Sequence, residues 1–168
     1  NYTNTRHNIG FKIIDAINAH FKLSKQKPKF KGLLTTGKIE EEKIYAIKPL
    51  TFMNNSGTAI KELIDYFKID AKDVFVFHDD MDIDFGKIKA KFGGSSAGHN
   101  GIESIDKFIG KDYSRVRIGI GHPKQKKKVN SHVLEDFKDD EEEKINEITE
   151  NIVKQLPTLI KKKIDLFS

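Results

Sequence analysis

The segment Val74-Phe75-Val76-Phe77 constrains the fold more than any other part of this sequence. Four consecutive apolar residues predict a short strand buried on both faces, as in a sheet that helices cover on both sides. Polar residues follow at once, in the order His78-Asp79-Asp80-Met81-Asp82. Ligands of α/β sheets bind beyond the carboxyl ends of the strands, so this polar cluster is a candidate site.

Helical and strand patterns alternate along the rest of the chain. Helical spacing of apolar residues occurs in four segments, 10–21, 57–68, 100–109 and 139–164. Strand patterns occur in 30–35, 44–47, 87–92 and 116–120. Pro157 predicts a kink, or a division into two helices, in the last helical segment. The alternation favours a three-layer α/β/α sandwich with a mixed, mostly parallel central sheet that includes one hairpin. No linker or repeat interrupts the sequence, so we expect residues 1–168 to form a single domain.

Composition excludes several classes of site. The sequence contains no cysteine, which excludes a disulfide framework, a thiolate zinc site, an iron–sulfur cluster and a cysteine nucleophile, and which fits a reducing compartment. No apolar run approaches the ~20 residues that a membrane-spanning helix needs. Lysine and arginine number 30 against 25 aspartate and glutamate residues, a net charge of +5. That balance suits a polyanionic partner, with a lysine-rich solvated surface as the alternative.

Two polar segments carry side chains suited to acid–base chemistry. His7 stands in Thr5-Arg6-His7-Asn8-Ile9-Gly10, before the first expected helix, and an imidazole titrates near neutral pH as a general base requires. The alternative for His7 is a surface histidine in a capping segment. One of the aspartates that follow the buried strand is the second candidate, because a carboxylate at a strand end orients a histidine base and stabilises its protonated form. The other acids nearby would then be solvated turn residues.

The same acids raise a metal hypothesis. An EF-hand loop starting at Asp80 fails, because Phe85 stands where glycine is required and Lys91 where the bidentate glutamate belongs. A magnesium site remains an alternative, although no other part of the sequence requires one.

Two further segments join an expected strand to an expected helix. Asn54 lies in Pro49-Leu50-Thr51-Phe52-Met53-Asn54-Asn55-Ser56-Gly57, and Asn100 lies in Gly93-Gly94-Ser95-Ser96-Ala97-Gly98-His99-Asn100-Gly101. The simpler interpretation of the first segment is that Asn54, Asn55 and Ser56 are ordinary N-cap residues. That of the second is a flexible loop in which Asn100 caps the following helix. In the alternative, an asparagine amide donates to a developing oxyanion. The glycine-rich stretch also presents backbone N–H groups at a helix start, which suits an anion or an acyl oxygen.

Basic residues recur at strand spacing. Lys87, Lys89 and Lys91 alternate and are expected on one face of a strand, and Arg115 and Arg117 share a face of a later one. Further lysines occur at 124, 126–128 and 161–163. Several such runs favour a surface that contacts phosphates, with ordinary solvated lysines as the alternative.

Taken together, these segments resemble the bacterial peptidyl-tRNA hydrolase family. They occur in the family's order and span most of the chain. The matching stretches are Tyr2 with Thr5-Arg6-His7-Asn8-Ile9-Gly10, Thr51-Phe52-Met53-Asn54-Asn55-Ser56-Gly57, His78-Asp79-Asp80-Met81-Asp82, Gly98-His99-Asn100-Gly101 and Arg117-Ile118-Gly119-Ile120-Gly121-His122-Pro123.

The resemblance implies an activity and a set of roles. The reaction is hydrolysis of the ester between a peptide and the 3′-terminal ribose of tRNA, which recycles the tRNA and uses no metal or organic cofactor. The family's catalytic histidine falls on His7 and its partner aspartate on Asp79. Its substrate-holding asparagines fall on Asn54 and Asn100, and Tyr2 matches a tyrosine that lines the site of the tRNA 3′ end.

The resemblance also implies a partner and a missing segment. Lys89, Lys91 and Arg117 match basic positions that meet tRNA phosphates, so the expected partner is peptidyl-tRNA, held by its acceptor arm and 3′ end. We expect a monomer in the cytoplasm with no membrane partner. The family opens with a buried strand and a Gly-x-x-Asn-Pro-Gly turn that would precede Asn1, so we expect the printed sequence to be part of a longer protein.

Two other functions stay open on the sequence. A non-catalytic RNA-binding module needs the basic surface but not the pairing of His7 with Asp79. A metal-dependent phosphoesterase would use Asp79, Asp80 and Asp82 and would lose activity with a chelator.

Overall fold

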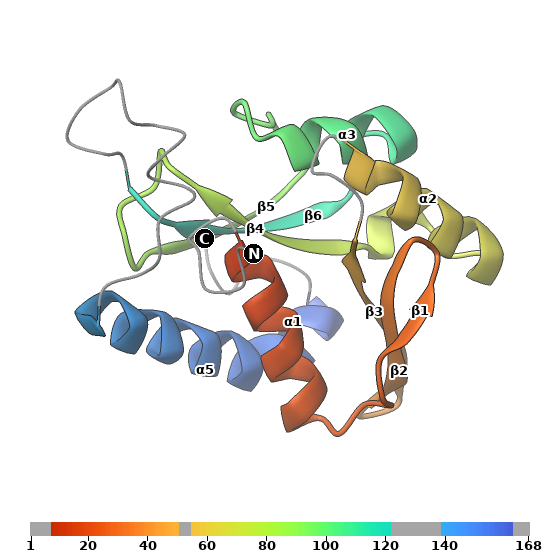
Figure 1. Cartoon of the computed structure of the whole chain (residues 1–168), viewed down its shortest axis with the longest axis horizontal. Helices are drawn as coiled ribbons and strands as arrows, with labels where there is room; N and C mark the ends of the chain where they lie inside the picture. The colour runs from red at the N-terminus through yellow and green to blue at the C-terminus, as the bar shows by residue number, and fades with distance from the viewer. Residues whose placement is uncertain (1–7, 51–54, 122–138, 163–168) are drawn as a thin grey trace. The chain divides into compact units, whose positions relative to one another are not determined.

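The structure is a computed structural model that describes residues 8–50, 55–121 and 139–162 (Figure 1). Its helical elements are α1 (Ile9–His20), α2 (Ser56–Phe67), the 3-10 turn η3 (Ala71–Asp73), α3 (Asn100–Ile109) and α5 (Asp139–Lys162). Its strands are β1 (Lys27–Lys29), β2 (Gly32–Ile39), β3 (Glu42–Pro49), β4 (Phe75–Asp80), β5 (Ile88–Phe92) and β6 (Ser114–Gly119). The α/β class is confirmed. None of the helices in these ranges is long and apolar enough to cross a bilayer.

The described strands form two sheets rather than one. The predicted hairpin is present as β2 and β3, which pair antiparallel from Gly32 opposite Pro49 to Ile39 opposite Glu42. It lies in a separate antiparallel sheet of order β1-β2-β3, because β1 pairs with the other edge of β2 (Figure 1). Among the described strands, the hairpin therefore pairs with β1 and not with the strands of the mixed sheet.

The second sheet is mixed and has the order β4-β6-β5. The β4–β6 pair is parallel, because the amide of Ser114 donates to the carbonyl of Val74 and the amide of Ile120 to that of Asp80. The β6–β5 pair is antiparallel, with the amide of Gly119 donating to the carbonyl of Lys87. One parallel and one antiparallel junction confirm a mixed sheet.

The chain divides into two compact units. One unit takes in the described parts of Asn1–Ala16, Val76–Lys91 and Arg115–Ser168, and the other takes in Ile17–Phe75 and Phe92–Ser114. The first unit buries apolar side chains from α1, β6 and α5, among them Ile9, Ile13, Val116, Ile118, Ile145, Ile152 and Leu159. The second buries Ile17, Leu34, Ile39, Ala59, Leu63, Ile64, Ile102 and Ile105.

Strand β4 differs from its prediction in length and in burial. It extends through Asp80, three residues past the apolar run. Phe75, Val76 and Phe77 are only partly buried, and the residues buried in β4 are the polar ones that follow them. Among the described strands, β4 pairs with β6 alone and is an edge strand, which leaves one side of this apolar run without a neighbouring strand.

Helix α5 continues through Pro157 as one helix, so of the two alternatives, a kink or a division into two helices, the division is wrong. Proline removes a backbone hydrogen bond and disfavours the helix interior. Ile152, Val153, Leu156 and Leu159 are buried on both sides of Pro157, and this packing holds the helix together.

Glycines allow two close backbone approaches. A Cβ atom at Gly10 would overlap the carbonyl oxygen of Phe77, so the first turn of α1 packs directly on β4. In the other unit a Cβ atom at Gly57 would overlap the carbonyl oxygen of Ser104, and the Gly57 amide donates to the Ser104 hydroxyl at 2.9 Å. Helices α2 and α3 pack closely for this reason.

Gly10→Ala is expected to destabilise the protein by about 1–3 kcal/mol, although alanine is the better helix former. The new methyl group meets backbone rather than a movable side chain, so α1 has to shift away from β4. Urea denaturation measures the change, with Lys12→Ala in the same helix as the matched control. A stability gain for Gly10→Ala would contradict the close approach of helix and strand.

Candidate active site

The carboxyl end of β4 carries three consecutive polar side chains. His78, Asp79 and Asp80 all lie within the strand and are buried, with Asp79 only 4% exposed. Because side chains alternate along a strand, Asp79 lies on the face opposite to His78 and Asp80. The expected carboxylate therefore stands at the expected strand end, held by regular strand geometry.

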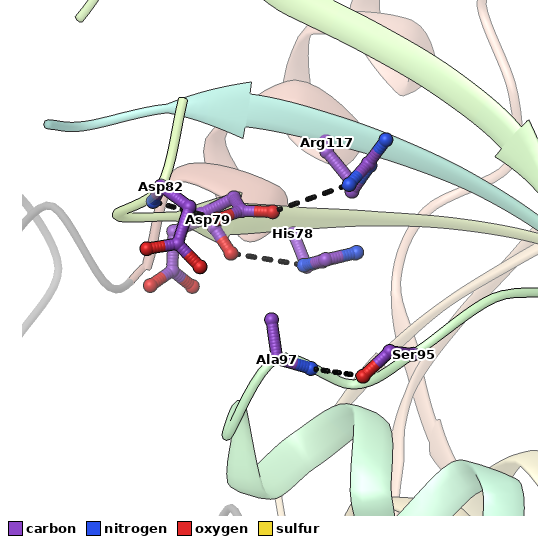
Figure 2. A network of polar contacts seen from close by, with 7 residues as sticks. His78, Asp79, Asp82, Ser95, Ala97 and Arg117 are labelled. Carbon is purple, nitrogen blue, oxygen red and sulfur yellow. Dashed lines mark hydrogen bonds and ion pairs between the residues drawn. The ribbon is translucent and has the colours of Figure 1, made fainter. Parts of the chain in front are cut away.

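His78 stabilises the backbone at Asp79. Its Nδ1 lies 2.9 Å from the carbonyl oxygen of Asp79 (Figure 2). A carbonyl only accepts, so Nδ1 carries the hydrogen in this interaction. The ring thereby fixes the peptide unit that carries the candidate carboxylate.

Asp80 is buried, contrary to what we expected of the acidic cluster. We expected the acids other than Asp79 to be solvated turn residues, and Asp82 and Asp84 are indeed exposed. Asp80 is instead 7% exposed, and its Oδ1 accepts from the Asp82 amide at 2.8 Å. Its Oδ2 lies 3.7 Å from Nη1 of Arg117. The amide and the arginine together compensate the burial of the Asp80 charge.

The start of α3 also differs from expectation. His99, and not Asn100, is the N-cap residue, and its Nδ1 accepts from the amides of Gly101 at 3.1 Å and Ile102 at 3.2 Å. The capping role for Asn100 is therefore wrong. Asn100 is the first helical residue and is exposed. Sequence reasoning missed His99 because histidine is not among the favoured N-cap residues.

This cap limits what the glycine-rich loop can bind. The amides of Gly101 and Ile102 already donate to His99, so they are not available to an anion or an acyl oxygen. Before the helix, the Ala97 amide donates to the Ser95 hydroxyl at 3.1 Å in a local turn (Figure 2). These three amides are thus already engaged in hydrogen bonds within the loop and the start of the helix.

The basic residues separate into exposed and buried groups. Lys89 and Lys91 are exposed on one face of β5 with Ala90 buried between them, as the alternation predicts. Lys87 is exposed beside Asp84, at 3.6 Å. Arg115 is only 1% exposed, so its expected place on a basic surface is wrong. The lysines at 124 and 126–128 lie outside the described residues.

Three of the candidate site residues, Tyr2, His7 and Asn54, also lie outside the residues that the structure describes. Within the part that it does describe, no group of three or more histidine, cysteine, aspartate or glutamate side chains is arranged to hold a metal ion. The metal hypothesis for Asp79, Asp80 and Asp82 gains no support there.

Comparison with known proteins identifies the family. Residues 1–167 match a family model described as peptidyl-tRNA hydrolase. The chain belongs to the peptidyl-tRNA hydrolase family. The resemblance seen in the five segments is thereby confirmed.

Relatives and solved structures agree with this assignment. A peptidyl-tRNA hydrolase of Pelagibacter ubique (strain HTCC1062) is 72% identical over 165 residues, which cover 98% of this chain and 89% of the relative. One of Bartonella quintana (strain Toulouse) is 46% identical over 160 residues, covering 95% and 83%. The crystal structure of peptidyl-tRNA hydrolase from Acinetobacter baumannii superposes with a TM-score of 0.91 at 32% identity, covering 96% of this chain and 83% of that one.

Proposed function

We propose that this chain hydrolyses the ester bond between the peptide and the 3′-terminal ribose of tRNA in peptidyl-tRNA, releasing the tRNA for reuse. The observation that carries the proposal is the match of residues 1–167 to the peptidyl-tRNA hydrolase family. The buried Asp79 at the end of β4 supports an enzyme over a non-catalytic RNA-binding module, which would need no such carboxylate.

His7 is the proposed general base and Asp79 its orienting carboxylate. His7 takes a proton from the water that attacks the ester carbonyl, and Asp79 stabilises the imidazolium that forms. The close packing of Gly10 on the carbonyl of Phe77 supports this pairing. Three residues of chain tether His7 within about 10 Å of Gly10. Asp79 is two residues along β4 from Phe77, about 7 Å.

Side-chain amides are the proposed stabilisers of the oxyanion. Asn54 and Asn100 hold the ester carbonyl and the neighbouring peptide, and Tyr2 lines the site of the tRNA 3′ end. For Asn100 the support is its exposure at the first position of α3, where His99 has already taken the capping role. Because the backbone amides of Gly101 and Ile102 already donate to His99, we assign stabilisation of the oxyanion to the side-chain amides and not to these two groups.

Lys89, Lys91 and Arg117 are the proposed ligands of the acceptor-arm phosphates. Phosphate contacts carry little sequence information, which suits an enzyme that accepts many tRNAs. Lys89 and Lys91 are exposed on one face of β5, as binding to phosphates requires.

Replacing Lys89 and Lys91 together by alanine should raise KM for peptidyl-tRNA about tenfold and leave kcat within about twofold. The slope of log KM against log salt concentration should fall by about 2, because each lysine would neutralise one phosphate. Steady-state kinetics at several salt concentrations measure both. Lys72→Ala, an exposed lysine outside β5, is the matched control. An unchanged salt slope would remove the two lysines from the tRNA surface.

We also propose that residues 1–168 act as one domain and one monomer, with a three-layer α/β/α arrangement and a mostly parallel central sheet. The continuous match over 1–167 and the high TM-score to a solved family member support this. The proposed compartment is the cytoplasm, and the absence of cysteine is compatible with its reducing conditions. Size-exclusion chromatography with light scattering tests the monomer.

Hydrolysis of purified peptidyl-tRNA, with EDTA present, tests the function. We expect free peptide and intact tRNA to form at the same rate with and without EDTA. Activity lost to EDTA and restored by Mg²⁺ would favour a metal-dependent enzyme. Binding of tRNA without cleavage by the folded protein would favour the RNA-binding module.

A further inference from the structure

The ion pair between Asp80 and Arg117 joins the strand that carries Asp79 to the strand beside it. Asp80 is the last residue of β4, and Arg117 lies in β6, which pairs with β4. The Asp80 side chain is 6% exposed and the Arg117 side chain 28% exposed. A buried carboxylate therefore stands beside an arginine that still reaches solvent, and the dashed line at Arg117 marks their interaction (Figure 2).

Arg117 interacts with Asp80 through charge, and this ion pair does not use an N–H donor of the guanidinium in a hydrogen bond. Its Nη1 lies 3.7 Å from Oδ2 of Asp80, which is too long for a hydrogen bond. The Nε atom is buried and has no hydrogen-bond partner among the described residues. A guanidinium has five N–H donors in a planar fork that matches the oxygens of a phosphate. Because Nε is buried, the donors that remain for a ligand are those of the terminal Nη groups of this partly exposed side chain, while Asp80 restricts where the group can lie.

Asp80 is itself anchored. Its Oδ1 accepts the amide hydrogen of Asp82 at 2.8 Å, across the turn that follows β4. One carboxylate oxygen is therefore fixed by backbone, and the other faces the arginine. This geometry orients the guanidinium from a rigid strand end, so less side-chain freedom is lost when a phosphate binds.

We infer that Asp80 is a positioning residue that orients Arg117 for a phosphate group of the tRNA. The inference rests on the proposed function, because it takes the phosphate to be part of peptidyl-tRNA. Asp80 touches no substrate in this role. It acts through Arg117, so its removal affects substrate binding and not the chemical step.

A double-mutant cycle in the full chain tests the inference. Asp80→Asn keeps the shape and the acceptor for the Asp82 amide but removes the charge that faces Arg117. We expect KM for peptidyl-tRNA to rise about fivefold, with kcat within about twofold. Arg117→Gln should raise KM by at least as much. The double variant should be no worse than Arg117→Gln alone, because Asp80 acts only through the arginine.

Thermal stability gives an independent signature. Arg117→Gln leaves the Asp80 carboxylate buried without its counter-charge and should lower Tm, and adding Asp80→Asn should recover part of that loss. Asp84→Asn is the matched control, since it removes an exposed carboxylate from the same turn that faces Lys87 instead. Its KM should stay within about twofold of wild type.

Several outcomes would overturn the inference. A wild-type KM for Asp80→Asn would do so. So would a result in which Asp80→Asn raises KM as much in the Arg117→Gln background as it does in the wild type. If Asp80→Asn does not fold, Arg117→Lys keeps the ion pair but presents one ammonium in place of the planar fork. That variant should raise KM, and an unchanged KM would likewise contradict an oriented guanidinium. Failure of the wild-type chain to cleave peptidyl-tRNA would instead refute the proposed function, which the cycle does not test.

Discussion

Replacing His7 by alanine is expected to lower kcat for peptidyl-tRNA hydrolysis by about 10²–10⁴-fold, with KM and Tm close to those of the wild type. A water molecule is a weak nucleophile until a base takes its proton as the carbonyl bond forms. Alanine removes that base but leaves the groups that bind the tRNA. Single-turnover hydrolysis at saturating enzyme separates this loss from any change in binding.

His20→Ala is the matched control for this prediction. His20 belongs to the last turn of α1, is exposed, and lies edge-on to Phe21. Its loss should change kcat by less than about twofold, because an exposed side chain far along the helix takes no part in the site. Turnover by folded His7→Ala near the wild-type rate would show that another group activates the water.

Local sequence patterns predicted which segments form helices and strands better than they predicted the partners of polar residues. The apolar run at Val74–Phe77 located β4, but the strand continues to Asp80. The apolar pattern stops at Phe77, so it could not show that the next three polar residues are also in the strand and buried. Their burial depends on interaction partners that apolar spacing does not record. The Asp79 carbonyl holds the His78 ring and Arg117 balances Asp80, and neither interaction has a signature in the spacing of residues.

The same limit explains the arginines and the cap. Alternation correctly placed Arg115 and Arg117 on one face of β6, since period 2 is local geometry. It did not reveal that Arg115 is fully buried and Arg117 partly exposed, because that depends on what packs on the strand. Likewise, propensity favoured Asn100 as the cap of α3, whereas the His99 ring fits the two amides.

The candidate site was reached by a different route. Residue chemistry marked His7 as a possible base and the Asn54 segment as a source of an amide donor, whereas Tyr2 and the specific roles of all three rest on the resemblance to a known family. Asp79 has a physical argument as well, because an acid that is 4% exposed at a strand end requires compensation that an ordinary surface acid does not. The family resemblance and the burial of the side chain both point to Asp79.

Asp79→Asn is expected to lower kcat by about 10²–10⁴-fold while keeping the fold, because asparagine has nearly the same shape as aspartate. The amide cannot balance the charge of the imidazolium, and its NH₂ group favours the wrong tautomer of the base. If the two residues act as a unit, Asp79→Asn added to His7→Ala should cause almost no further loss. Asp84→Asn, an exposed acid in the turn after β4, controls for the change in charge. Additive losses would show that Asp79 acts separately from His7, and wild-type turnover by Asp79→Asn would leave the base to be oriented by another group.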